Sequence, residues 1–186
     1  MNRFQGLATP LANVWCIERS RMGDARGFLS RLFCAQELAA FGWLWPIAQI
    51  NHARTEKRGT VRGLHFQQPP HCEAKLVSCV QGAVWDVAVD LRKGSPSFLK
   101  WTAQVLSAEN GRAMLIPPGC AHGFQALEDG VELLYCHSHP YVPGADAGLN
   151  PLDPTLAISW PQPITQLSDK DRQQALLQES FQGLTP

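Results

Sequence analysis

The chain has 186 residues, which suits one ordinary domain and is long enough to bury a core without disulfides or a structural metal. Sixteen basic and sixteen acidic residues cancel, so no global field favours nucleic acid or an anionic membrane. The N-terminus lacks the continuous apolar region of a signal peptide, and the apolar stretch 39–50 is short and interrupted by Pro46. We therefore expect a single cytoplasmic domain, residues 1–186, that binds small molecules and neither nucleic acid nor membranes.

In chain order, the first predicted element is a short helix over 35–41. From Ala48 to Tyr135, short apolar or alternating runs are separated by glycine, proline and polar turns, which is typical of an all-β sandwich or barrel. The clearest strand is 83–90, in which Trp85, Val87 and Val89 alternate with polar or small residues. Further strands are predicted at 75–80, 101–106, 113–116 and 131–136. This strand spacing suits a jelly roll.

The last third of the chain combines a proline-rich loop with a predicted helix. The loop spans 141–163 and reads as an ordered connection. Ser168 then starts a helix that we expect to run to about Ser180. This makes the C-terminal segment from about 168 helical.

Six cysteines lie mostly within apolar runs and include no C-x-x-C pair. Such a distribution predicts free thiols that pack as small apolar residues, and it argues against a disulfide framework or a zinc site. The six are Cys16, Cys34, Cys72, Cys79, Cys120 and Cys136.

The stretch PPGCAHGF at 117–124 contains P-x-G-x-x-H, which resembles the second histidine motif of the cupin superfamily and would deliver His122 to the mouth of a barrel. In the first cupin motif, a glutamate ligand would stand where this chain has Lys75. An ammonium there would repel a bound metal, so we expect no metal. A metal-dependent cupin enzyme using His71, Glu73 and His122 stays open as an alternative.

Without a metal, the predicted mouth offers a set of groups for proton transfer: Arg62, His65, Lys75, His122 and Tyr135. Neutral imidazole accepts protons near pH 7, cations stabilise oxyanions or phosphates, and a phenol can return a proton. A single strand histidine is more often a hydrogen-bonded structural residue. The residues alone therefore leave both interpretations open.

Several stretches, in order over roughly 24–171, resemble the dTDP-4-dehydrorhamnose 3,5-epimerase family, deoxysugar epimerases built on a cupin jelly roll. The first are DARG at 24–27, QIN at 49–51, RGLHFQ at 62–67, AKLV at 74–77 and GAVWDVAVDLRKGSPSF at 82–98. They continue with LSAEN at 106–110, IPPGCAHGF at 116–124, Tyr135, Tyr141, DPTLAISWP at 153–161 and LSDKD at 167–171. The resemblance implies an all-β, cupin-type jelly roll with a few short peripheral helices.

The resemblance also implies a reaction. Protons leave C3 and C5, on either side of the C4 ketone of a nucleotide-linked 4-keto-6-deoxyhexose, and return from the opposite face. No cofactor is required, because the ketone acidifies both positions. By position, His65 would be the base, Tyr135 the acid and Lys75 the group that stabilises the enolate oxygen. Asp171 would orient His65, although an acid three residues after Ser168 is also explained by a helix-capping box.

Family positions that contact the substrate are implied for several further residues. Arg62 and His122 would line the sugar and phosphate end, and Tyr141 would stack on the base. Arg26, Gln49 and Asn51 match positions that bind the nucleotide. The family site draws residues from two subunits, so a homodimer is implied.

The chain departs from the family pattern at four positions near the substrate. Arg31 stands where the pattern D-x-R-G-x-F-x-E ends in glutamate, and Ala53, Glu73 and Asp146 replace serine, glutamine and glutamate. These departures bear on which nucleotide sugar binds; dTDP-4-dehydro-6-deoxy-D-glucose is the leading substrate. The alternatives are another nucleotide 4-ketosugar, epimerisation at C3 or C5 alone, and a non-enzymatic cupin that binds a sugar nucleotide.

Overall fold

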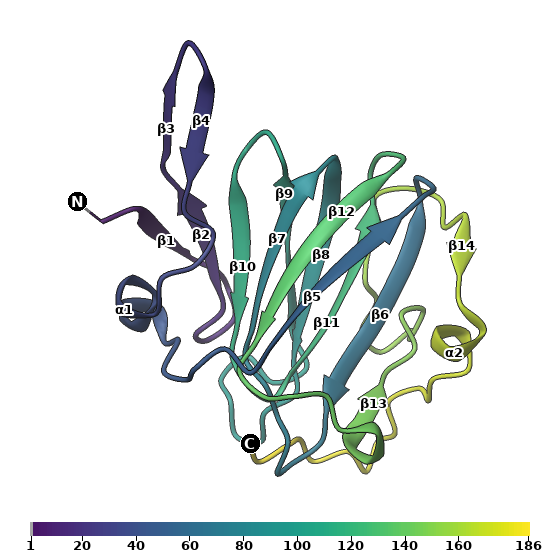
Figure 1. Ribbon diagram of the computed structural model, residues 1–186. Coiled ribbons are helices and arrows are strands. Elements are labelled where there is room, and N and C mark those ends of the chain that lie inside the picture. The colour runs from purple at the N-terminus through teal and green to yellow at the C-terminus, as the bar shows by residue number, and fades with distance from the viewer. Residues whose placement is uncertain (1) are drawn as a thin grey trace.

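The computed structural model describes residues 2–186 and shows two mainly antiparallel sheets packed face to face as a jelly roll (Figure 1). The first sheet has the order β1 (Phe4–Ala8), β2 (Trp15–Arg19), β10 (Arg112–Ile116), β7 (Lys75–Gln81), β12 (Val131–His137), β5 (Gln49–Thr55). The second has the order β13 (Asp146–Gly148), β6 (Thr60–Gln67), β11 (Cys120–Ala126), β8 (Ala83–Asp90), β9 (Trp101–Ser107), with β14 (Gln166–Leu167) parallel to β6. The predicted all-β jelly roll is confirmed.

A separate hairpin of β3 (Arg21–Asp24) and β4 (Gly27–Ser30) projects from the body of the molecule at the upper left of Figure 1. Its side chains are almost all exposed. The hairpin carries Arg26 at its turn, and the sequence patterns did not predict it. An exposed two-stranded hairpin is marginally stable by itself, so its stability depends on a further contact.

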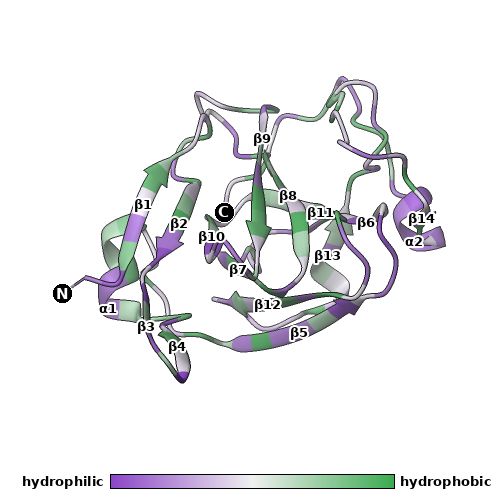
Figure 2. Ribbon diagram, turned by 90° about the horizontal axis from the view of Figure 1, so that it is seen from above, coloured by the Kyte–Doolittle hydropathy of each residue, from purple (hydrophilic) through white to green (hydrophobic). Residues whose placement is uncertain are grey.

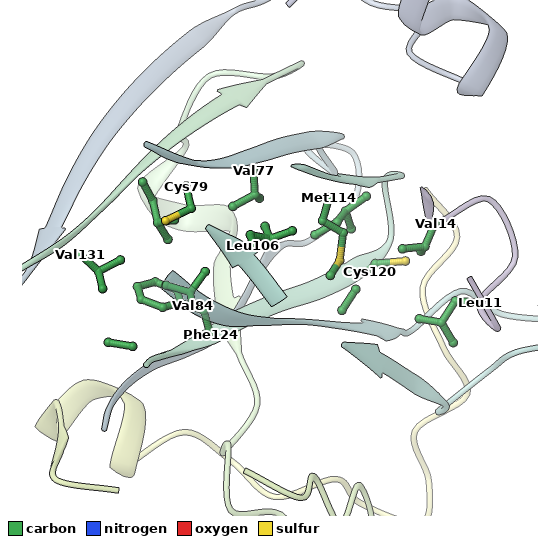
Figure 3. Packing of buried hydrophobic residues seen from close by; sticks show 14 residues of the cluster. Leu11, Val14, Val77, Cys79, Val84, Leu106, Met114, Cys120, Phe124 and Val131 are labelled. Carbon is green, nitrogen blue, oxygen red and sulfur yellow. The ribbon is translucent and has the colours of Figure 1, made fainter. Parts of the chain in front are cut away.

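The core between the two sheets consists of alternate side chains from both inner faces, among them Leu106, Met114 and Phe124 (Figure 3). The alternation predicted for 83–90 is confirmed by β8. Val84 and Ala88 point into this core, whereas Trp85 and its alternating partners pack on the outer face of the second sheet. Removing this apolar area from water provides most of the stabilisation, at about 25 cal/mol per Å².

Short helices and the chain ends cover the outer faces. The helix α1 (Ala35–Leu38) and the 3-10 turn Ala39–Phe41 confirm the helix predicted over 35–41, and Leu38 and Trp43 bury beneath them against the first sheet. Gly42 ends this segment with a φ of 97°, the left-handed conformation that glycine adopts without strain. A second 3-10 turn, Pro143–Ala145, precedes β13.

The predicted C-terminal helix starts at the expected cap but is much shorter than expected. Helix α2 spans only Asp169–Arg172, and the prediction to Ser180 is wrong. In a longer helix the backbone groups of this segment would form hydrogen bonds within the helix. Here they bond instead to the turn after β13: Asn150 Nδ2 donates to the Arg172 carbonyl, and the Leu177 N–H donates to Asp153. Figure 2 shows α2 as hydrophilic, in contrast to the green apolar segments of the sheets.

Other predictions are confirmed. The strands predicted at 75–80, 83–90, 101–106, 113–116 and 131–136 occur within one residue of those bounds. All six cysteines are free, and three of them are buried. Within residues 2–186, no helix is long and apolar enough to cross a membrane.

Candidate active site

One pocket of about 430 Å³ opens between the ends of the two sheets. Nine of the twelve site residues expected from the sequence line it: Gln49, Asn51, Arg62, His65, Lys75, His122, Tyr135, Tyr141 and Asp146. A tenth, Asp171, lies directly behind His65. Residues far apart in the chain therefore converge on one site.

A bulge in β6 explains how Arg62 and His65 reach the same pocket although they are three residues apart. In a regular strand, an odd separation places two side chains on opposite faces. On the neighbouring strand β11, His122 pairs with His65 and Phe124 pairs with Arg62. A separation of three residues on β6 therefore lies opposite a separation of two residues on β11. The extra residue turns Arg62 and His65 toward the same side.

Glycines allow the two strands to approach closely at this bulge. Gly63 has a φ of 130°, and a side chain there would meet Gly123 of β11 at 2.5 Å. A Cβ at Gly123 would in turn meet the Arg62 carbonyl at 2.8 Å. Both positions therefore require glycine for steric reasons.

The His65 imidazole forms a short hydrogen bond to a carboxylate. Its Nε2 lies 2.6 Å from Asp171 Oδ1, and the other carboxylate oxygen accepts from the Gly63 N–H at 3.3 Å. Burial raises the pKa of Asp171, but the hydrogen bonds from His65 and Gly63 outweigh it and hold that pKa below its usual value. An ionised Asp171 fixes Nε2–H as the donor and leaves Nδ1 as the basic atom.

Tyr135 occupies the same pocket from β12. Its ring stands edge-on to His122, with centroids 5.8 Å apart, and packs along the ring of His137. Burial raises the pKa of Tyr135 far above its ordinary value, and the nearby Asp86 raises it further. The phenol is therefore protonated at neutral pH and available as a proton donor.

A second histidine–carboxylate pair lies deeper. His122 Nε2 is 2.7 Å from Asp86 Oδ1, and both side chains are buried. Burial raises the pKa of Asp86, and the His122 partner lowers it in part. Asp86 was not predicted as a site residue, although its place opposite the apolar face of strand 83–90 was visible in the sequence. A buried acid there requires a partner.

Lys75 reaches the pocket from β7 and pairs with Glu73 at 2.9 Å. Its Nζ also donates to the His65 carbonyl at 3.1 Å. The ammonium is thus held beside the strand that carries His65. Positioned donors of this kind stabilise an oxyanion that develops nearby.

At the rim, polar side chains from four segments surround the opening. Gln49 accepts from the Tyr141 N–H at 2.9 Å and donates to Asn51 at 3.0 Å. Asp146 forms an ion pair with Lys170 at 2.5 Å and accepts a hydrogen bond from the Tyr141 hydroxyl at 3.4 Å. Lys170 was not predicted, and its place directly before Asp171 is the only sequence signal that pointed to it.

Arg26 and Arg31 lie outside this pocket. Arg26 is at the exposed tip of the β3–β4 hairpin, where it pairs with Asp24. Arg31 follows β4 and pairs with Glu37 of α1. Within one chain neither guanidinium reaches the residues that line the pocket.

The ligand set considered for a metal-dependent cupin does not assemble. The Glu73 carboxylate is bound by the Lys75 ammonium, His122 bonds to Asp86, and His71 contacts His139. No group of three or more histidine, cysteine, aspartate or glutamate side chains within residues 2–186 is arranged to hold a metal ion.

Fold and site together define a class: a cupin-type jelly-roll enzyme whose pocket holds an imidazole paired with a carboxylate, a protonated phenol and an ammonium. A family model described as dTDP-4-dehydrorhamnose 3,5-epimerase matches residues 8–179. This chain belongs to that family and is an isomerase that epimerises nucleotide-linked sugars.

Individual relatives agree with this assignment. The dTDP-4-dehydrorhamnose 3,5-epimerase of Sinorhizobium fredii (strain NBRC 101917 / NGR234) is 41% identical over 96% of this chain and 93% of the relative. The dTDP-4-dehydrorhamnose 3-epimerase of Streptomyces niveus is 40% identical over 95% of this chain and 86% of the relative. The crystal structure of dTDP-6-deoxy-D-glucose-3,5-epimerase from Legionella pneumophila Philadelphia 1, in complex with dTDP-4-keto-L-rhamnose, superimposes with a TM-score of 0.88. It is 38% identical, and the match covers 93% of this chain and 92% of that one.

Proposed function

We propose that this protein converts dTDP-4-dehydro-6-deoxy-D-glucose to dTDP-4-dehydro-L-rhamnose by inverting C3 and C5. One observation carries the proposal: the His65–Asp171 pair and the protonated Tyr135 line the same pocket. A binding protein needs neither a base nor an acid in its pocket. The ligand of the Legionella relative, dTDP-4-keto-L-rhamnose, is the expected product.

In the proposed reaction, Nδ1 of His65 takes the proton from C3 while Asp171 stabilises the imidazolium that forms. The electrons of the broken C–H bond move to the C4 oxygen, and the Lys75 ammonium stabilises this enolate. Tyr135 then delivers a proton to C3 from the other face of the ring. Solvent reprotonates the phenolate and deprotonates His65, and the same sequence at C5 completes the conversion.

The polar rim is proposed to hold the nucleotide. Gln49 and Asn51 present amide groups, Arg62 supplies a cation for phosphate, and the exposed ring of Tyr141 offers a stacking face for the base. His122, held by Asp86, lines the sugar end. No cofactor takes part in this scheme, because the ketone of the substrate acidifies C3 and C5.

A homodimer completes the proposal. The β3–β4 hairpin and the segment before β5 expose large apolar side chains, among them Phe28, Leu29 and Leu44, which are 61%, 66% and 74% exposed. Contiguous exposed apolar groups mark interaction surfaces. We propose that in this dimer the hairpin of each copy lies against the pocket of the other, so that the Arg26 at its turn joins that site. The single domain over 1–186 and the cytoplasmic location remain predictions.

The second candidate is epimerisation at C3 alone. The Streptomyces niveus relative, 40% identical to this chain, is named a 3-epimerase. The same base and acid would serve either outcome, because the choice depends on whether the intermediate stays bound through a second exchange.

Proton NMR in D₂O tests both candidates. The purified protein is mixed with freshly made dTDP-, GDP-, UDP- and CDP-linked 4-keto-6-deoxyhexoses, and deuterium entry at C3 and C5 is followed. Exchange with inversion at both carbons of the dTDP sugar is the expected result. Exchange at C3 alone supports the second candidate. If another nucleotide sugar is turned over best, that sugar replaces the dTDP sugar as the substrate. No exchange with any sugar, from protein shown to be folded, overturns the proposal.

A further inference from the structure

His137 lies next to the proposed acid in the wall of the pocket. It ends β12 two residues after Tyr135, and alternate residues of a strand point to the same face. Its ring packs along the Tyr135 ring, with centroids 6.1 Å apart and ring planes inclined by 26°. His137 also lines the pocket, and the reaction proposed above does not use it.

The strand register places His137 beside Lys75. In the first sheet, His137 is paired with Lys75 of β7 on one side and with Gln49 of β5 on the other. Directly paired residues of antiparallel strands carry their side chains on the same face, with Cβ atoms about 5 Å apart. All three residues line the pocket. The imidazole is therefore a neighbour of the ammonium to which the proposed function assigns the enolate oxygen.

The hydrogen-bonding capacity of the His137 ring is not used within the protein. Its Nε2 is buried and has no partner among residues 2–186. His65 and His122 differ, because each of them bonds to a carboxylate. Buried polar atoms nearly always have a partner, so an unpartnered nitrogen on a ring that lines a pocket points to a ligand. A half-turn about the Cβ–Cγ bond exchanges the two edges of the ring and keeps its plane against Tyr135.

The His137 ring is neutral at neutral pH. Burial and, second, the charge of Lys75 lower its pKa to about 4, although Glu73 acts in the opposite direction. A neutral imidazole carries one N–H and is a hydrogen-bond donor. It can polarise a substrate ketone without placing a second positive charge beside Lys75.

We propose that His137 is a further catalytic residue: its ring N–H donates a hydrogen bond to the C4 oxygen of the substrate, beside the Lys75 ammonium. This inference rests on the proposed function. When the base removes a proton from C3, the electrons of the C–H bond move to the C4 oxygen, and both hydrogen bonds strengthen as that oxygen becomes negative. His137 keeps its own proton throughout. The enolate formed at C5 has the same C4 oxygen, so His137 acts in both exchanges.

Steady-state kinetics and deuterium exchange with the dTDP sugar test this for four proteins: wild type, His137→Leu, His137→Gln and Cys136→Ala. The Leu variant has no donor. Its kcat should fall about 10²-fold or more, with KM changed less, because the lost interaction forms in the transition state. Exchange at each carbon that wild type exchanges should slow by the same factor. The Gln variant retains an N–H and should keep at least about tenfold more of the activity than Leu.

Cys136→Ala is the matched control. Cys136 precedes His137 on the same strand, but its side chain packs with the apolar cluster on the other face of the sheet. This variant should have wild-type kinetics. Calorimetric binding of dTDP, which lacks the sugar, should be unchanged in all four proteins.

Each other outcome contradicts the inference. A Leu variant with wild-type kcat and exchange overturns it. Slower exchange at only one of two carbons would assign His137 to proton transfer at that carbon. A Gln variant no more active than Leu would mean that only packing against Tyr135 matters.

Two further results are covered. If the Leu variant lacks the native near-UV circular dichroism, His137→Phe replaces it, because Phe keeps a planar ring against Tyr135 and has no N–H; full activity of Phe overturns the inference. Absence of turnover by wild type would contradict the proposed function and, with it, this inference. A slow variant of an active enzyme tests the inference alone.

Discussion

Asp171 takes part in both the pocket and the cap of helix α2: its carboxylate lies 2.6 Å from His65 Nε2, and its backbone N–H donates to the Ser168 side chain at 3.0 Å. The capping and orienting interpretations of this aspartate therefore do not compete. Ser168 caps the single turn of α2, and the cap sets the place from which the carboxylate reaches β6.

Substituting Asp171→Asn separates these two tasks. Because the amide cannot fix the same tautomer of His65 or stabilise its imidazolium, kcat should fall about 10²–10⁴-fold. Ser168→Ala should instead lower the free energy of unfolding by about 1 kcal/mol. Steady-state kinetics and urea unfolding of both variants measure the two effects. A fully active Asp171→Asn enzyme would leave the carboxylate a structural role only.

Tyr135→Phe should uncouple exchange from inversion. Burial keeps this phenol protonated, so its loss removes the proton donor and leaves the base in place. We expect deuterium to enter at one carbon from the His65 face with no inverted product, as followed by NMR in D₂O. Calorimetric binding of dTDP should be unchanged and serves as the control. Normal inversion by this variant would show that another group is the acid.

The exposed apolar hairpin predicts an association that can be weakened. The double variant Phe28→Ser, Leu29→Ser should shift sedimentation from dimer toward monomer and lower activity at low protein concentration, because Arg26 would no longer be supplied by a second copy. Leu176→Ser, which changes an exposed leucine of the C-terminal segment, is the matched control. A monomeric wild type with full activity would contradict the homodimer.

Asp90 predicts a stability change with pH. Burial raises the pKa of Asp90, but hydrogen bonds from Arg92, Ser95 and Ser97 outweigh it and lower that pKa to about 2. A carboxyl with a depressed folded-state pKa stabilises the fold above its unfolded pKa of about 3.9, and this stabilisation is lost as pH falls toward 2.

Asp90→Asn should therefore cost about 2 kcal/mol at pH 7 and progressively less between about pH 4 and 2. Urea unfolding at several pH values measures the difference between the two proteins. Glu56→Gln, which removes an exposed partner of Arg54, should change the free energy of unfolding much less, because water screens an exposed ion pair. A difference that does not change with pH would rule out the carboxylate as its source.

Much of the architecture was predictable because it is encoded locally. The alternation in β8 and the short apolar runs between turns are properties of neighbouring residues, and they predicted the core strands within one residue. The exposed β3–β4 hairpin has no alternation of apolar and polar residues, so no local pattern predicted it. Helix α2 was overestimated because local propensity favoured its continuation, while Asn150 and Asp153, distant in sequence, bind the groups that the helix would have used.

The sequence by itself determined which chemical groups this protein has: histidines that can accept a proton, two tyrosines, a lysine in place of a metal-binding glutamate, and a balanced overall charge. Only the tertiary structure decided how they meet. The bulge in β6 turns Arg62 and His65 to one side, and Asp86 and Glu73 become partners of His122 and Lys75 in the buried wall. The physical reason is that a strand's register and the pairing of buried charges depend on contacts between distant strands, which no local pattern of residues specifies.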